Sequence, residues 1–458
     1  MPLILPGNVA SATASTTFSV ANSCRFNDGD SADLSLTLGS SLGTRSLYTF
    51  SCWIKRGVLG TTQNLFEATD GTYPTTFSIS SADKLVFYDT GENATFTSDA
   101  VLRDSAAWYH LVCRVDTSQA SNENRVKFYI NGVQATTTQT NTLTQDGNIS
   151  WGKEVAHYVG GRANYFDGYM AEVVWITASS LAPTSFGEFD EDSPTIWKPI
   201  DVSELTFGTH GFYLDFEASD NLGNDANGGT DWTETNLDAT DQASDSPTNN
   251  FCTMNPLFIY PNNNTFSEGN CVVSGTASAW QLSRGTIGVS QGKWFWEILF
   301  VASPNYYSQA GIVDESTTGA SSTAEDGTTL FHNGDDGAMY RHGTDFGGTL
   351  GWDYGAYGTM DGSSDILGVA LNADDDQITL YKNGAAIVSD FGLDVPATLL
   401  FPLASQHGSG RVSKYNFGGC SGFTVSSGNA DADGYGNFEY AVPSGYYALC
   451  TKNLAEYG

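Results

Sequence analysis

Apolar and polar residues alternate over many short stretches of the chain, and no long segment has apolar residues at helical spacing. In the stretch 108–115, one side of an extended backbone collects the apolar side chains Tyr109, Leu111, Cys113 and Val115. A period of two residues is that of a β-strand that buries one of its faces. The pattern therefore predicts an all-β protein built from antiparallel sheets.

Two Asn-Gly pairs mark hairpin turns. Asn131-Gly132 follows the strand-like stretch 126–130, and Asn383-Gly384 follows the stretch 378–382. Both central residues of the tightest hairpin turn need a positive φ, which asparagine and glycine tolerate best. Each pair therefore predicts a β-hairpin. Large aromatic residues inside other strand-like stretches are assigned to the cores: Trp53, Trp294 and Trp296.

Length and charge limit the classes of function. A chain of 458 residues is expected to form two or three domains. Its 19 Lys and Arg residues face 52 Asp and Glu residues, which gives a formal net charge of −33. Phosphate backbones and anionic lipids would repel such a chain, so we expect no nucleic-acid partner and no membrane docking. The longest apolar runs, such as 399–404, are too short to cross a bilayer, so no membrane insertion is expected.

The N-terminus and the cysteines carry no processing or metal signal. Residues 1–20 contain no charged residue, and Pro6 and Gly7 interrupt their only apolar run, so a secretory signal is not expected. The seven cysteines are scattered and form no C-x-x-C pair, which predicts buried thiols rather than disulfides or a zinc site. They are Cys24, Cys52, Cys113, Cys252, Cys271, Cys420 and Cys450.

Composition divides the chain into segments. Residues 218–250 are rich in Asp, Asn, Gly and Thr, contain no Lys or Arg, and have few apolar side chains. Such a stretch is typical of a loop between domains. We therefore predict two β-sandwich (jelly-roll) domains, at 21–217 and 263–458, with an acidic linker at 218–262. Residues 1–20 are predicted to be an attachment segment, or a strand donated to a neighbour.

Four segments of the first half occur in a familiar order: Tyr48–Ile54, Trp108–Val112, Phe128–Gly132 and Phe166–Val173. Together they resemble laminin-G-like, concanavalin A-like jelly rolls. The resemblance implies two packed antiparallel sheets. It also implies binding of glycans or proteins, in some relatives through calcium.

Some relatives of that fold hydrolyse β-glucans with an E-x-D-x-E strand. The nearest match in this chain runs from Glu188 through Asp190 to Asp192. On a strand these acids would share one face, as a retaining carboxylate pair requires. The last acid is one methylene shorter than glutamate, however, and the flanking residues are typical of loops. We therefore expect an acidic turn and no enzyme, with a glycan depolymerase as the alternative.

The second half contains Gly292–Ile298, Asp365–Leu371, Ile378–Gly384 and Tyr415–Gly418 in this order. The segments are similar to those of SPRY (B30.2-like) domains. SPRY domains are recognition modules whose ligand surface is made by loops at one end of a sandwich. The resemblance therefore implies binding and no catalytic residues in this half.

Further segments connect the two halves: 181–190, 197–200, 245–251, 255–257 and 445–454. With them, nearly the whole chain resembles virion proteins of marine bacteriophages of the tail-fibre or receptor-binding type. The resemblance implies a location on the virion surface, on the tail or capsid exterior. The expected partners are other virion proteins and a host cell-surface glycan or protein. Weak sites gain from avidity, so we expect a homo-oligomer, with a trimer as one form. A purely structural role, in capsid decoration or tail assembly, is the alternative.

Candidate ligand residues follow from the chemistry of sugars, which present apolar C–H faces and a rim of hydroxyl groups. Aromatic rings beside acids and amides suit both, and they gather in one run of the second half: Asp335, Asp336, Tyr340, Trp352, Tyr354 and Tyr357. Weaker candidates in the first half are Trp151, Tyr158 and Tyr165, beside Asn164. About half of all these rings are expected in the cores.

One short segment is a candidate calcium loop, and we expect no other cofactor. Asn429, Asp431 and Asp433 offer oxygen ligands at the first, third and fifth positions, and Gly434 follows. Glu439 lies one residue short of the usual last ligand, and no flanking helices are predicted. The alternative is an acidic surface turn.

Overall fold

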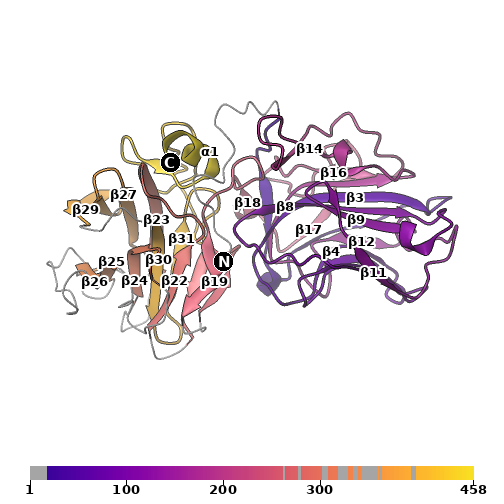
Figure 1. The fold of residues 1–458 in the computed structure, drawn as a ribbon, viewed down its shortest axis with the longest axis horizontal. Coiled ribbons are helices and arrows are strands. Elements are labelled where there is room, and N and C mark those ends of the chain that lie inside the picture. The colour runs from indigo at the N-terminus through magenta and orange to yellow at the C-terminus, as the bar shows by residue number, and fades with distance from the viewer. Residues whose placement is uncertain are drawn as a thin grey trace. The chain divides into compact units, whose positions relative to one another are not determined.

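The computed structural model describes residues 18–260, 264–276, 280–301, 308–317, 329–333, 339–342, 359–360, 364–393 and 399–458. For 259–260, 329–333 and 339–342 it describes the backbone alone. The described residues form two compact bodies, one of residues 18–103 and 108–248, the other chiefly of those from 249 onward (Figure 1). Nearly all their regular structure is β, in sheets with antiparallel strand pairs, which confirms the predicted fold class.

The first body is a sandwich of two sheets. One sheet has, in order, β10 (Val133–Gln134), β9 (Val126–Ile130), β8 (Trp108–Asp116), β3 (Leu47–Arg56), β13 (Gly168–Thr177), β1 (Ser23–Phe26) and β18 (Gln242–Ala243), with β16 (Phe212–Leu214) paired to β13. The other has β11 (Thr137–Thr140), β7 (Ala94–Ser98), β6 (Leu85–Asp89), β5 (Thr75–Ile79), β4 (Gln63–Thr69), β12 (Ala156–Val159), β2 (Asp33–Thr37) and β17 (Thr233–Thr235).

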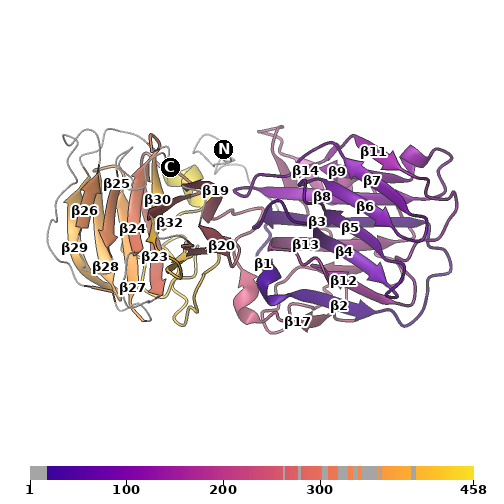
Figure 2. The same cartoon turned by 90° about the horizontal axis from the view of Figure 1, so that it is seen from below.

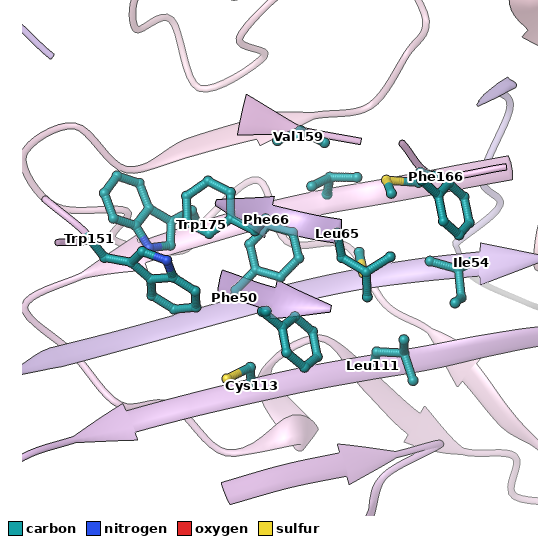
Figure 3. Packing of buried hydrophobic residues seen from close by; sticks show 14 of the residues in the cluster. Phe50, Ile54, Leu65, Phe66, Leu111, Cys113, Trp151, Val159, Phe166 and Trp175 are labelled. Atoms are coloured by element: carbon teal, nitrogen blue, oxygen red, sulfur yellow. The ribbon is translucent and has the colours of Figure 1, made fainter. Parts of the chain in front are cut away.

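Aromatic side chains fill the space between these sheets (Figure 3). Phe50 of β3 stacks on Phe66 of β4 with ring centroids 4.7 Å apart. The predicted inward face of β8 is confirmed, because Leu111, Cys113 and Val115 belong to this core and Tyr109 packs against it. Alternation along the strands thus produces the core, because every second side chain enters it.

The segment 181–216 covers the outer face of the β3–β8–β13 sheet with a second apolar cluster. Its hairpin of β14 (Gly187–Phe189) and β15 (Trp197–Pro199) places the indole Nε1 of Trp197 2.9 Å from Nδ1 of His110. Burial lowers the pKa of His110 to about 3, so the ring is neutral at pH 7. This histidine is a packed residue of the sheet.

The structure differs from the predicted linker at 218–262. Within this segment, β17 pairs with β2 and β18 pairs with β1, and Trp232 is 3% exposed in the core of the first body. Asp245 forms a buried ion pair with Lys55, with its Oδ2 2.6 Å from Nζ. Residues 218–248 are therefore part of the first body, and the remainder begins the second with β19 (Met254–Tyr260). The few apolar residues of the segment are enough to attach it to the sandwich.

The second body also contains two sheets. Within the described residues, one has β19, β22 (Trp280–Gly285), β30 (Leu400–His407), β24 (Ser308–Asp314), β25 (Thr329–Asn333) and β26 (Met339–His342). The other has β20 (Thr265–Ser267), β21 (Val272–Ser274), β31 (Val412–Asn416), β23 (Lys293–Val301), β27 (Ile366–Asn372), β28 (Gln377–Lys382) and β29 (Ala385–Gly392), with β32 (Tyr447–Ala448) parallel to β23.

The C-terminal segment, which ends in helix α1 (Thr451–Tyr457), covers the outer face of the β23 sheet. Glu297 of β23 anchors it by accepting hydrogen bonds from the backbone N–H groups of Glu439 and Tyr440, at 2.9 and 2.8 Å. Burial raises the pKa of Glu297 to about 7, although these bonds lower it. These hydrogen bonds attach the C-terminal segment to β23 within the second body.

Several local predictions are confirmed. Asn131 and Gly132 have φ of 48° and 77°, and Asn383 and Gly384 have φ of 51° and 77°, each pair between adjacent antiparallel strands. Of the seven cysteines, all except Cys420 are buried. The tryptophans assigned to the cores are 3% exposed or less: Trp53, Trp294 and Trp296.

Candidate functional site

The outward side of the β4–β5–β6 sheet in the first body is rich in hydroxyl groups. Figure 2 shows the strands of this sheet, from β11 at the top to β17 at the bottom. Phe66, Phe77, Phe87 and Phe96 are paired across neighbouring strands and point into the core. The residues next to each of them in sequence must point the other way. We call this outward side the hydroxyl face.

One row of the hydroxyl face crosses the whole sheet in direct register. It consists of Thr233, Ser35, Tyr158, Glu67, Thr76, Tyr88, Thr95 and Thr140, one residue from each strand. At the usual strand spacing of about 4.8 Å the row spans about 34 Å. A second row runs beside it through Asn64, Ser78, Val86, Thr97 and Thr138.

Glu67 is the charged residue at the centre of the row. It is 6% exposed, and the side-chain amide of Asn64 donates to its Oε2 at 2.7 Å. Burial raises the pKa of Glu67, while the nearby Arg162 and the bond from Asn64 oppose the rise. The site thus holds a carboxyl group that accepts hydrogen bonds when it is ionised.

Asp33 on β2 is a second acid of the hydroxyl face. Burial raises the pKa of Asp33 to about 6, and a hydrogen bond with the side chain of Thr235 opposes the rise. Since Thr235 lies on β17, this contact also joins β2 to the edge strand β17. The strand positions that point outward therefore carry two acids, Asp33 and Glu67, within the described residues of this sheet.

Two tyrosines lie in the row on either side of Glu67. Tyr158 lies opposite Glu67 on the neighbouring strand, and Tyr88 lies beyond Thr76. Both are half-buried, and the Tyr88 hydroxyl donates to Oδ1 of Asn93 at 3.2 Å. The sequence analysis singled out Tyr158, and it missed Tyr88 and Glu67. The alternation within Leu85–Asp89 indicates an outward Tyr88, but no local pattern shows which strands become its neighbours.

The structure corrects the prediction for Trp151. Its side chain is fully buried beside the ring of Phe66 (Figure 3). The rings of Tyr48 and Phe87 also lie against it, and its Nε1 donates to the carbonyl oxygen of Thr75 at 3.0 Å. A ring enclosed on all sides in this way cannot contact a ligand. Tyr165, another candidate, is half-buried in the loop before β13 and outside the row.

The aromatic run of the second half lies largely outside the described residues. This applies to Asp335, Asp336, Trp352, Tyr354 and Tyr357, and for Tyr340 the structure describes the backbone of β26 alone. Of the predicted attachment segment, residues 1–17 also lie outside the described part. These predictions remain as the sequence left them.

The candidate calcium loop is closed by protein donors. The Oδ1 atom of Asp431 accepts from the backbone N–H groups of Asp433 and Tyr435, and its Oδ2 accepts from Ala448 N–H and the Asn453 amide, all between 2.8 and 3.0 Å. These four bonds use the acceptor capacity of one carboxylate.

The other two members of the candidate loop are also engaged. Asn429 donates to the carbonyl oxygen of Glu439 at 2.9 Å, and Asp433 accepts from the hydroxyl of Tyr457 at 2.8 Å. Within the described residues no cluster of three His, Cys, Asp or Glu is placed to hold a metal ion. The calcium prediction for this loop stays as the sequence left it.

Glu188 and Asp190, the candidate carboxylate pair, share one lysine. Nζ of Lys198 lies 3.4 Å from Oε1 of Glu188 and 3.3 Å from Oδ2 of Asp190. Hydrogen bonds from the backbone N–H groups of Ser193 and Asp192 and the bond from Lys198 lower the pKa of Asp190. A proton donor for glycoside cleavage needs a raised pKa, so this environment opposes that role.

Comparison with known proteins agrees with the fold of the first body. Residues 28–181 match the family described as the concanavalin A-like lectin/glucanases superfamily. No curated protein matches the sequence of this chain significantly. Among the described residues, no helix has the length and apolar character that a membrane-spanning helix needs.

Solved structures show distant likeness. A protein of Bacteroides ovatus, described as a candidate carbohydrate-binding protein, is 16% identical, and the match covers 49% of this chain and 60% of that one with a TM-score of 0.34. The SPRY domain of human HERC1 is 16% identical, over 35% of this chain and 96% of that domain, with a TM-score of 0.29. A heptameric pentraxin of Limulus polyphemus is 13% identical, over 36% and 80%, with a TM-score of 0.28. The SPRY character of residues 263–458 stays a prediction.

Proposed function

We propose that this protein is a recognition protein that binds a glycan on the hydroxyl face of its first body. The observation that carries the proposal is the unbroken row of polar side chains with Tyr158 and Tyr88 on either side of Glu67. Tyrosine rings pack against the C–H face of a sugar, while carboxylate and hydroxyl oxygens accept from its hydroxyl groups. The concanavalin A-like family match of residues 28–181 supports a lectin-like function.

The proposed setting is the surface of a bacteriophage particle, on the tail or capsid exterior. The sequence resemblance to marine phage virion proteins supports this setting. The charge of −33 also suits salt water, where ions screen self-repulsion beyond about 8 Å. Other virion proteins and a host cell-surface glycan would then be the partners. Several copies in a homo-oligomer, such as a trimer, would raise the avidity of weak single sites.

Binding is tested with the full chain and polysaccharides extracted from the surface of host bacteria, immobilised on a biosensor. We expect saturable binding that the substitution Glu67→Ala weakens by about tenfold, since a buried acceptor is lost. The matched control is Glu188→Ala, which removes an exposed acid of the same body and should leave the affinity unchanged. Absence of binding, or equal loss in both variants, would contradict the proposal.

We further propose that binding occurs without catalysis. The depolymerase alternative assigns cleavage to Glu188 and Asp190, and the ion pairs of both acids with Lys198 speak against it. Incubation of the chain with the same polysaccharide, followed by size-exclusion chromatography, tests this. Shortened chains that disappear in the variant Asp190→Asn would establish the enzyme, and unchanged length would exclude it for that substrate.

A further inference from the structure

The hydroxyl face is much longer across its strands than along them. β5, β6 and β7 contain five residues each, so each strand presents a pair of outward side chains, such as Thr76 with Ser78. Along a strand, such a pair covers about 7 Å, whereas the row across the sheet covers about 34 Å. A ligand that contacts most of the face must therefore be elongated and must cross the strands.

The hydroxyl face itself carries few charged groups and few apolar groups. Outward strand positions of this sheet carry the acids Asp33 and Glu67, and no Lys, Arg or His, within the described residues. Arg162, in the loop after β12, is the base that acts on Glu67. An anionic chain would meet these two acids in addition to a protein of net charge −33, so repulsion would oppose its binding.

A protein ligand suits this face less well. Protein interfaces are usually centred on a group of apolar and aromatic side chains that become fully buried. Apart from the two tyrosines, the outward strand positions offer Val86 and Ala156 as apolar side chains, and these lie in different rows and on strands that are not adjacent. Polar side chains on every strand of the row, all of them hydroxyl-bearing except Glu67, instead match a ligand that carries hydroxyl groups at regular intervals.

Resting on the proposed function, we infer that the ligand is an extended, uncharged glycan chain that lies across the strands. Tyr158 and Tyr88 hold it at points three strand spacings apart, about 14 Å. Glu67, between them, accepts hydroxyl hydrogen bonds from the middle of the chain. Asn64 donates to one oxygen of that carboxylate at 2.7 Å and fixes its orientation.

The test uses the full chain and a panel of soluble polysaccharides. The uncharged members are glucans, mannans, galactans and xylans, and the anionic members are alginate, pectate and carrageenan. We expect an uncharged member to bind most tightly, and carboxymethylation of that member to weaken binding by about tenfold. Tighter binding of an anionic member would overturn this inference and leave the proposed function standing. Binding of no polysaccharide would overturn the proposed function itself.

Length dependence tests the orientation. Fragments of about six sugar units reach from Tyr158 to Tyr88, and fragments of one or two units do not. We expect the longer fragments to bind at least about tenfold more tightly, and Tyr158→Ala and Tyr88→Ala each to remove about that gain. The matched control is Tyr73→Ala, because Tyr73 is 53% exposed in the loop between β4 and β5, outside the row. Equal affinity for short and long fragments, or an equal effect of Tyr73→Ala, would overturn the inference.

Discussion

Two buried glutamates of the first body, Glu67 and Glu172, have different roles because their surroundings differ. Glu67 is buried beside Asn64 and near Arg162. Glu172 of β13 is buried beneath the segment 181–216, where the hydroxyl of Tyr213 donates to its Oε2 at 2.8 Å. Burial, together with the charges of Asp215 and Glu217, raises the pKa of Glu172 to about 8, although the hydrogen bond from Tyr213 lowers it. The folded chain therefore holds Glu172 protonated at neutral pH.

This protonation predicts a dependence of stability on pH. The pKa of Glu172 is about 8 in the folded chain and about 4.5 in the unfolded chain, so the folded state binds the additional proton between these values. The free energy of unfolding must then fall as pH rises from about 4.5 to about 8, with a limiting slope of about 1.4 kcal/mol per unit from this group. Glu172→Gln remains neutral and should lack that part of the slope.

The slope of the free energy of unfolding against pH is measured by urea unfolding between pH 4 and pH 9, with tryptophan fluorescence as the signal. The exposed Glu123→Gln variant is the control and should keep the slope of the wild type. An unchanged slope in Glu172→Gln would show that Glu172 is ionised in the folded chain.

Hairpins are the elements that the sequence specifies most directly. Asn131 and Gly132 adopt positive φ between β9 and β10, as the pair predicts. The same turn also supports a tertiary contact, because a Cβ on Gly132 would lie 2.4 Å from ring carbons of Trp197. Turn chemistry and the packing of the β14–β15 hairpin therefore both require glycine at this position.

A pair of substitutions separates the two requirements. Gly60→Ala tests the backbone alone, because Gly60 has φ of 75° and no atom within 4 Å of the added Cβ. It should cost about 1 kcal/mol. Gly132→Ala should cost a further 1–3 kcal/mol, about the usual penalty of overpacking, because Trp197 must move. Chemical denaturation measures the free energy of unfolding of both variants. An equal decrease in the two would mean that Trp197 moves without cost.

At the scale of the whole molecule, the division into bodies depends on a few side chains in an acidic stretch. Residues 218–248 are mostly polar, yet Leu222, Trp232 and Leu237 belong to the core of the first body. Asp245 adds the buried ion pair with Lys55 and accepts from Nε1 of Trp108 at 3.0 Å. The stretch thus completes the first sandwich and supplies the last strand of the hydroxyl face, β17.

Trp232→Ala tests this assignment. Removing a buried tryptophan should lower the free energy of unfolding by about 3–5 kcal/mol, and calorimetry should show the loss in one transition, that of the first body. Thr233→Ala is the matched control, because Thr233 is the exposed next residue, at the start of β17, and it should change stability by less than about 0.5 kcal/mol. If Trp232→Ala were as mild as the control, residues 218–248 would be the linker that their composition predicts.

The sequence by itself determined the all-β class, the hairpin turns, the core tryptophans of the strands and the buried thiols. These depend on alternation and turn chemistry, which act between residues close in the chain. It also singled out Tyr158, but grouped it with Trp151, because an aromatic residue outside a clear strand has no periodic neighbours to show its direction. Only the tertiary structure decided that Trp151 enters the core, that residues 218–248 join the first body, and that Glu67 lies between Tyr158 and Tyr88. Register between strands that are distant in sequence is fixed by the packing of the whole core, and no local pattern contains that information.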